Sequence, residues 1–243
     1  MKRYLQNSSI AVLVLIVTTS VTFAAPLQAP EATINKRPGF MEDIFANAGV
    51  IGWLIVLLSV VAAALAIEDF MTLKRDKLAP PHLIDEIEAL LDEEKFQEAV
   101  EVCEAEPTYL TDIIGAGLTK LGHSFNTIQV AYEERHEEHD IKLNAKVGWL
   151  SLIAAVAPMM GLLGTVNGMI TTFGTIASQP SVKPADLASG IKGALVTTLL
   201  GLTVAIPVTA LYVFFKNKTQ MLSLEVGAIV EELFERFRQR PSA

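Results

Sequence analysis

The sequence predicts an all-α integral membrane protein, in which three transmembrane helices carry long cytoplasmic helical extensions after a cleavable signal peptide. Three observations lead to this fold class. Hydrophobic residues make up 51% of the 243-residue chain and are concentrated in three long runs. Each run provides the roughly 20 residues that a helix needs to cross a bilayer. Outside these runs, apolar side chains recur at helical spacing, without the alternation that is typical of strands.

The N-terminus has the parts of a secretory signal peptide. Lys2 and Arg3 supply the positive charge, a short apolar core follows, and small residues precede a cleavage point after Ala24. We therefore expect residues 1–24 to be the signal peptide and residues 25–47 to be a periplasmic N-terminal segment. An uncleaved membrane helix is the alternative, and it leaves the topology of the following residues unchanged.

Hydropathy and charge divide the rest of the chain into six parts. They are a first transmembrane helix (48–68), a cytoplasmic helical region (69–146), a second transmembrane helix (147–177), a periplasmic link (178–186), a third transmembrane helix (187–215) and a cytoplasmic amphipathic helix and tail (216–243). The orientation follows from basic residues that lie near the cytoplasmic ends of the helices, at Lys74, Arg75, Lys77, Lys142, Lys146, Lys216 and Lys218. The mature N-terminus is then periplasmic and the C-terminus cytoplasmic.

The cytoplasmic parts have the apolar spacing of a helical bundle. One helical stretch is expected between Pro81 and Pro107, a second over residues 110–121, and a third from about Thr127 into the second transmembrane helix. The third transmembrane helix is expected to continue into the tail, where an apolar stripe comprises Leu222, Val226, Ile229, Val230, Leu233 and Phe237. Either the helices of residues 81–146 or neighbouring subunits must cover this stripe.

Several classes of function are disfavoured. A formal net charge of −8 without a basic patch argues against nucleic-acid binding. Cys103 is the only cysteine, so an internal disulfide is excluded. His136 and His139 are three residues apart, whereas the helical zinc motif needs four, and the charges around them are typical of a solvated helix face. We therefore expect no enzymatic activity, no cofactor and no metal.

The second and third transmembrane helices carry small and hydroxyl residues on particular faces. In the second helix the residues that recur every seven positions are Ser151, Pro158, Thr165 and Thr172. In the third helix the residues that follow one another at spacings of four, three and four positions are Ala194, Thr198, Gly201 and Ala205. Such faces permit either close helix packing or the lining of a narrow path. The residues expected to shape this packing or path are Pro158, Gly161, Gly164, Gly168, Gly201 and Pro207.

No carboxylate occurs within the second and third transmembrane helices, and their one ionisable side chain, Lys192, lies close enough to an end to reach the interface. Hydroxyls such as those of Thr165, Thr197 and Thr198 can order water or accept a hydrogen bond, but they cannot carry a proton near neutral pH. A proton path along these helices would need a titrating group from another chain.

Two segments resemble the signatures of the ExbB/TolQ/MotA proton-channel family, and the resemblance is strongest to the ExbB-like branch. Residues 157–170, with the sequence APMMGLLGTVNGMI, resemble the signature of the family's second span. Residues 190–207, with the sequence GIKGALVTTLLGLTVAIP, resemble the signature of its third span. The order of one span, a large helical region, two spans and a tail also matches, so the resemblance covers about residues 40–240.

The resemblance implies a proton-motive-force-driven motor in a bacterial inner membrane. In that motor a homo-oligomeric ring, a pentamer, encloses single-span partners of the ExbD/TolR type, and an aspartate of the partner carries the proton. Thr165 and Thr198, with Thr197 beside them, would face this partner and line the proton path. In the ExbB-like branch the motor energises TonB-dependent outer-membrane transport, so a TonB-like protein is a further implied partner.

One position departs from the family pattern. ExbB and TolQ members commonly have glutamate where this chain has Gly193, and Lys192 makes the neighbouring charge positive. Other roles stay open, namely a TolQ-like, MotA-like or gliding-type motor subunit, or a non-conducting membrane scaffold. The signal peptide and three spans favour the ExbB-like branch over the four-span MotA-like branch.

Overall fold

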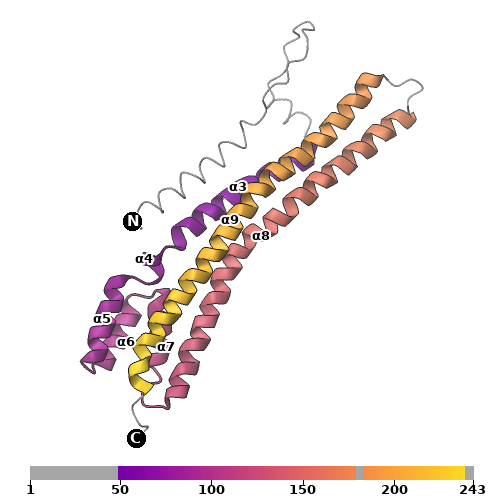
Figure 1. Ribbon diagram of the computed structural model, residues 1–243. Helices are drawn as coiled ribbons and strands as arrows, with labels where there is room; N and C mark the ends of the chain where they lie inside the picture. The colour runs from indigo at the N-terminus through magenta and orange to yellow at the C-terminus, as the bar shows by residue number, and fades with distance from the viewer. Residues whose placement is uncertain (1–48, 179–182, 239–243) are drawn as a thin grey trace. The chain divides into compact units, whose positions relative to one another are not determined.

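The computed structural model describes residues 49–178 and 183–238 (Figure 1). Within these ranges every regular element is an α-helix, with the bounds α3 Gly49–Thr72, α4 Arg75–Leu78, α5 Pro81–Asp92, α6 Phe96–Ala105, α7 Tyr109–Leu118, α8 Phe125–Ser178 and α9 Pro184–Arg238. Helices α3, α8 and α9 are long and apolar enough to cross a membrane. The predicted all-α fold with three such helices is therefore confirmed, whereas the predicted signal peptide (1–24) and periplasmic segment (25–47) lie outside the described residues.

Helices α8 and α9 are each much longer than a membrane span. They contain 54 and 55 residues, against the roughly 20 that a bilayer core requires. Each of them joins a predicted transmembrane segment to a predicted cytoplasmic helix without interruption, as the lack of any helix-stopping signal between these segments indicated. Pro158 and Pro207 lie inside these helices, where each ring removes one backbone hydrogen bond and favours a bend.

The chain forms two compact units. We name the units after the predicted topology: the membrane unit contains, of the described residues, 49–63, 151–178 and 183–211, and the cytoplasmic unit contains 64–150 and 212–238. In the membrane unit the buried positions are mostly small, as at Ala157, Ala194 and Ala205, while large apolar side chains face outward. Ile170 and Ile206, for example, are 66% and 68% exposed, which suits a surface that contacts lipid or another membrane helix.

The cytoplasmic unit has a conventional apolar core. Its largest fully buried side chains come mainly from α5, α7, α8 and α9 and include Leu83, Ile87, Leu110, Ile113, Ile114, Leu150, Val226 and Phe234. The ring of Phe234 on α9 stacks on that of Tyr132 on α8, with 5.2 Å between the centroids, and Gly117 on α7 leaves space for it. Phe237 of the tail's apolar stripe contacts Phe96 on α6, with 5.7 Å between the ring centroids, and the stripe residues Val226 and Val230 are buried. The helices of residues 81–146 thus cover the stripe, which is one of the two alternatives that the sequence left open.

The stretch between Pro81 and Pro107 differs from the single helix expected there, because it divides into α5 and α6. Glu94 adopts φ 60°, in the left-handed region. The N–H of Lys95 donates to the Leu90 carbonyl at 2.9 Å, and the N–H of Glu94 donates to the Leu91 carbonyl at 3.3 Å. This is the Schellman pattern of a helix C-terminus, which usually has glycine at the left-handed position. The sequence therefore carried no glycine signal for the break.

Replacing Glu94 with glycine is expected to stabilise the cytoplasmic unit. Glycine adopts the left-handed conformation without the steric cost of a Cβ, and the net gain is about 0.5–1 kcal/mol after the greater flexibility of the unfolded chain is counted. The measurement is the thermal unfolding midpoint of the purified full-length protein in detergent. Glu93→Gly, one residue earlier at φ −79°, is the matched control and should lower the midpoint. A lower midpoint for Glu94→Gly would contradict the expectation.

Candidate functional site

Helices α8 and α9 contact each other along a seam of small residues in the membrane unit. A Cβ added at Gly201 would lie 2.6 Å from the Ala157 carbonyl oxygen, and one added at Gly168 would lie 2.9 Å from the Ala194 Cβ. A Cβ added at Gly161 would lie 3.0 Å from the Thr197 carbonyl oxygen and 3.0 Å from the Thr198 Cα. The residue numbers rise on α8 as they fall on α9, so the two helices are antiparallel. Three of the predicted packing positions, Gly161, Gly168 and Gly201, therefore lie where the two helices touch.

The hydroxyls of Thr165 and Thr198 meet across this seam. Their Oγ1 atoms are 3.4 Å apart, and Thr198 Oγ1 also donates to the Gly161 carbonyl at 3.0 Å. Thr165 Oγ1 donates to the Leu162 carbonyl of its own helix at 2.6 Å. With both hydroxyl protons directed to carbonyls, the oxygen lone pairs remain available to accept a hydrogen bond. The pair can therefore receive a proton donor such as water or a protonated carboxyl group.

Thr197 lies deeper in the seam than Thr198. Its side chain is buried, its Oγ1 donates to the Ala194 carbonyl at 2.7 Å, and it lies against Gly164, where no Cβ would fit. Gly190 makes a similarly close approach to Thr172 nearer the ends of the two helices. These contacts show why glycine stands at both positions, since hydroxyl-bearing side chains of the facing helix occupy the space.

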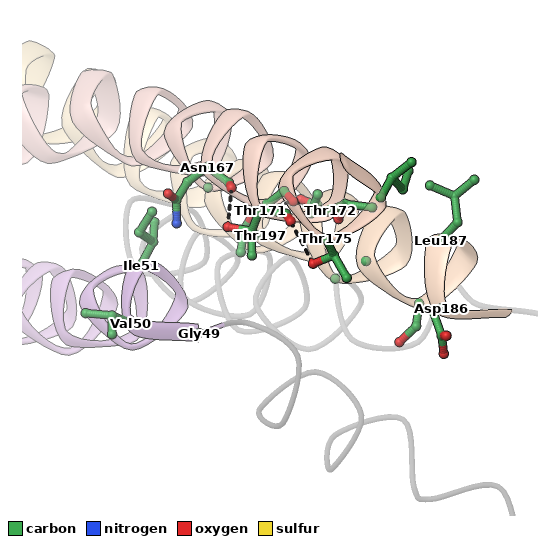
Figure 2. Close-up of a pocket in the computed structure, with 17 residues that line it drawn as sticks. Gly49, Val50, Ile51, Asn167, Thr171, Thr172, Thr175, Asp186, Leu187 and Thr197 are labelled. Atoms are coloured by element: carbon green, nitrogen blue, oxygen red, sulfur yellow. Dashed lines mark hydrogen bonds between the residues drawn. The ribbon is translucent and has the colours of Figure 1, made fainter. Parts of the chain in front are cut away.

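A cavity of about 490 Å³ opens beyond the seam, where α8 ends and α9 begins (Figure 2). Residues of α8 and α9 and the first turn of α3 line it, and the polar ones among them are Asn167, Thr171, Thr172, Thr175, Asp186, Ser189 and Thr197. Gly164 and Gly168 lie at its inner end. Because Gly164 and Thr197 directly precede Thr165 and Thr198, the cavity reaches the level of the hydroxyl pair.

The position at which this chain departs from the family pattern, Gly193, lies at this cavity. Gly193 lines it, whereas Lys192 lies on another face of α9, in a shallow apolar groove with Ile191 and Leu195. Asp186 in the first turn of α9 also lines the cavity, whereas hydropathy had placed this residue in the link. The signal that could have found it is Pro184 followed by an acidic residue, which is typical of a helix start.

A polar cluster joins three helices in the core of the cytoplasmic unit. The hydroxyl of Tyr109 on α7 donates to Asp140 Oδ1 at 3.1 Å and lies 3.2 Å from His136 Nδ1 on α8. The other ring nitrogen of His136 is 3.2 Å from Ser223 Oγ on α9. Burial raises the pKa of Tyr109 well above its usual range, so this phenol stays protonated as a donor.

His139 is also partly buried rather than solvated, and its Nε2 lies 2.6 Å from Asp112 Oδ2 on α7. Arg135 lies 3.7 Å from the same carboxylate oxygen. Together with the cluster at Tyr109, these contacts explain why His136 and His139 face inward among charged neighbours. In the part of the chain that the structure describes, no group of three His, Cys, Asp or Glu side chains is placed to hold a metal ion.

The thiol of Cys103 is expected to resist alkylation in the folded protein. Cys103 is buried on α6, and burial raises its pKa to about 11, so less than about one hundredth of it is thiolate at pH 8. Labelling with iodoacetamide at pH 8, followed by mass spectrometry, should leave the native protein unmodified and modify it fully after denaturation in urea. Rapid labelling of the native protein would contradict this expectation.

Comparisons with known proteins agree with this architecture. The sequence profile of the MotA/TolQ/ExbB proton channel family matches residues 105–227, about half of the chain. An ExbB-like biopolymer transport protein of Synechocystis is 33% identical over 184 residues, which cover 73% of this chain and 71% of that protein. An ExbB homologue of Methanothermobacter thermautotrophicus is 29% identical over 182 residues, which cover 74% of this chain but only 64% of the relative.

The solved structure of MotAB from C. jejuni has the same fold. The TM-score is 0.60 at 16% sequence identity, and the match covers 94% of this chain and 89% of that chain. At this identity the likeness concerns the fold alone, and the sequence relatives supply the evidence for descent. The family profile over half of the chain and the Synechocystis relative over most of both lengths lead to one conclusion. The chain belongs to the MotA/TolQ/ExbB proton channel family.

Proposed function

We propose that this chain is an ExbB-like subunit of an inner-membrane motor driven by the proton-motive force. Five copies form a ring around single-span partners of the ExbD/TolR type, and the motor energises TonB-dependent outer-membrane transport. In the proposed topology, residues 69–146 and 216–243 are cytoplasmic and the link of residues 178–186 is periplasmic. The end of the α8–α9 pair that bears the cavity is then the outer end.

One observation carries the proposal, namely the hydroxyl pair of Thr165 and Thr198 at the α8–α9 seam. Residues 147–178 and 187–215 contain no carboxylate, so nothing in these two helices can take up and release a proton beside the pair. A carboxyl group on a membrane helix of a partner would supply the titrating group, and the threonine oxygens would accept its hydrogen bond. The site is thus half of a proton path.

The test is proton uptake by the purified complex. The full-length chain is isolated from membranes with the proteins that co-purify, reconstituted into liposomes that contain a pH-sensitive dye, and exposed to a pH gradient and membrane potential. We expect a single-span protein with an aspartate in its membrane segment to co-purify, and proton uptake to require it. Liposomes with this chain alone are the control. An intact complex that takes up no protons would support the non-conducting scaffold instead.

The physiological role needs a separate measurement. Deletion of the gene for this chain should reduce the TonB-dependent uptake of a substrate across the outer membrane, and expression of the intact chain should restore it. An unchanged uptake accompanied by a weakened cell envelope would favour the TolQ-like role, and a loss of movement would favour a motility role.

A further inference from the structure

We propose that the cavity at the outer end of α8 and α9 is a vestibule for a hydrated monovalent cation, with Asp186 as the residue that attracts it. This inference rests on the proposed function and names a site that the hydroxyl pair alone does not provide. The vestibule would gather the coupling cation from the periplasm and bring it to the level of Thr165 and Thr198. Figure 2 shows the side chains that line it.

The hydrogen bonds of the lining favour a cation. Each threonine hydroxyl of the cavity donates its one proton to a carbonyl of its own helix, with the bonds Thr171 to Asn167 at 2.9 Å, Thr172 to Gly168 at 2.8 Å, Thr175 to Thr171 at 3.0 Å and Thr197 to Ala194 at 2.7 Å. The lone pairs of four hydroxyl oxygens are therefore left as acceptors. Asn167 can turn its amide oxygen toward a cation as well.

The charge of the cavity lining is negative and also favours a cation. Asp186 is the only ionisable residue among the described residues that line the cavity. A helix N-terminus by itself favours anions, but here the N–H groups of Asp186 and Leu187 already donate to the Lys183 carbonyl, at 3.0 and 3.5 Å. The carboxylate in the first turn of α9 offsets the remaining positive end of the helix dipole. The cavity is thus rich in acceptors and carries one negative charge.

Asp186 lies on the same side of α9 as Gly193, the position at which this chain departs from the family pattern. The two residues are seven positions apart, which is two helical turns, so they lie on the same face of α9 and both line the cavity. Gly193 lines the cavity without contributing a side chain, and the carboxylate of Asp186 lies two turns nearer the start of α9. A cation held there would remain hydrated, since the cavity volume of about 490 Å³ has room for several water molecules.

The first test measures the sign of the electrostatic potential in the cavity and does not depend on ion flux. Cys103 is the only cysteine, so Cys103→Ala gives a cysteine-free background into which Thr175→Cys places one thiol on the cavity wall. Cationic and anionic methanethiosulfonate reagents are then added to right-side-out membrane vesicles that contain the native complex. The rate of each reagent is divided by its rate with a free thiol in solution. After this correction we expect the cationic reagent to react with Thr175→Cys about tenfold faster than the anionic one.

The control variants separate charge from access. Asp186→Asn should bring the ratio of the two rates close to one, and Asp186→Glu should preserve the preference. Phe173→Cys, on an exposed face of α8 that does not line the cavity, should react slowly with both reagents. Equal rates for both reagents at Thr175→Cys with Asp186 intact would overturn the proposal, even if the Asp186 variants fail to accumulate.

The second test uses flux through the reconstituted complex and identifies the cation. Proton concentration is varied at constant Na⁺, and Na⁺ is varied at constant pH. Asp186→Asn should raise the half-saturating concentration of the coupling ion about three- to tenfold and leave the maximal flux unchanged. Glu101→Gln, an exposed acid on α6, is the charge-matched control and should change neither value.

The outcomes distinguish this inference from the proposed function. If flux depends on the hydroxyl pair but Asp186→Asn changes neither the labelling ratio nor the half-saturating concentration, the vestibule is wrong and the motor assignment stands. If the complex conducts no ion while the labelling still prefers the cation and needs Asp186, the cavity remains a cation site and the motor assignment fails.

Discussion

Replacing Thr198 with valine is expected to lower proton flux through the reconstituted complex by about 10- to 100-fold, because a buried proton donor left without its acceptor costs about 1–3 kcal/mol. Valine keeps the shape of threonine but removes the hydroxyl. The 3.4 Å contact with Thr165 Oγ1 and the 3.0 Å bond to the Gly161 carbonyl are both lost. A proton donor that approaches the seam then meets a methyl group in place of an acceptor.

The fold should survive this change, so the loss of flux can be assigned to the site. The Gly161 carbonyl lies inside α8, where the helix backbone also offers it a donor, so the loss of the Thr198 hydroxyl should cost no more than about 1.5 kcal/mol of stability. Thr203→Val is the matched control, because Thr203 is exposed and its hydroxyl donates at 2.8 Å to the Leu199 carbonyl of its own helix. Flux at the wild-type level in Thr198→Val, with the ring intact, would refute a role for the hydroxyl pair.

Replacing Gly201 with alanine is expected to prevent the stable packing of α8 on α9. The added Cβ would lie 2.6 Å from the Ala157 carbonyl oxygen and 3.1 Å from the Gly161 Cα. Both neighbours are backbone atoms, which cannot rotate away as a flexible side chain would, so the two helices must move apart. Overpacking usually costs about 1–3 kcal/mol, and a separation that breaks the whole seam belongs at the upper end of that range.

The amount of the complex and its thermal midpoint in detergent measure this effect. Gly201→Ala should reduce the yield of assembled complex several-fold and lower the midpoint. Gly174→Ala is the control, because a Cβ at Gly174 meets no atom within 4 Å and alanine is the better helix former. If the two variants behave alike, the close approach at Gly201 does not determine the packing.

The transmembrane helices and the faces that meet could be predicted from the sequence, whereas the pairing of individual positions could not. Hydropathy located the three spans because a bilayer requires long apolar runs. The periodicity of Thr165 and Thr198 assigned each to a face of its own helix. That their hydroxyls meet depends on the register of two antiparallel helices, which periodicity within one helix does not contain.

The features that sequence reasoning missed share a physical cause. Asp186 was placed outside the third span because hydropathy marks where a helix enters lipid, not where its hydrogen bonding begins. The break after α5 was missed because Glu94 occupies a backbone conformation that usually identifies itself by glycine. His136 and His139 were taken as solvated because their partners Tyr109, Asp112 and Ser223 are distant in sequence.

The glycine contacts also determine where this chain can change in length. Several contacts at different heights set the register of α8 against α9, from Ala157 with Gly201 to Thr172 with Gly190, so the connecting residues are not needed to set it. Residues inserted between Ser178 and Pro184 would add only the small entropy of a longer loop. One residue inserted between the contact positions of either helix would turn the side chains on one side of the insertion by about 100° relative to those on the other, and would take some of the glycines off the seam. Homologues should therefore vary in length at the link and keep a constant spacing between the glycines of each helix.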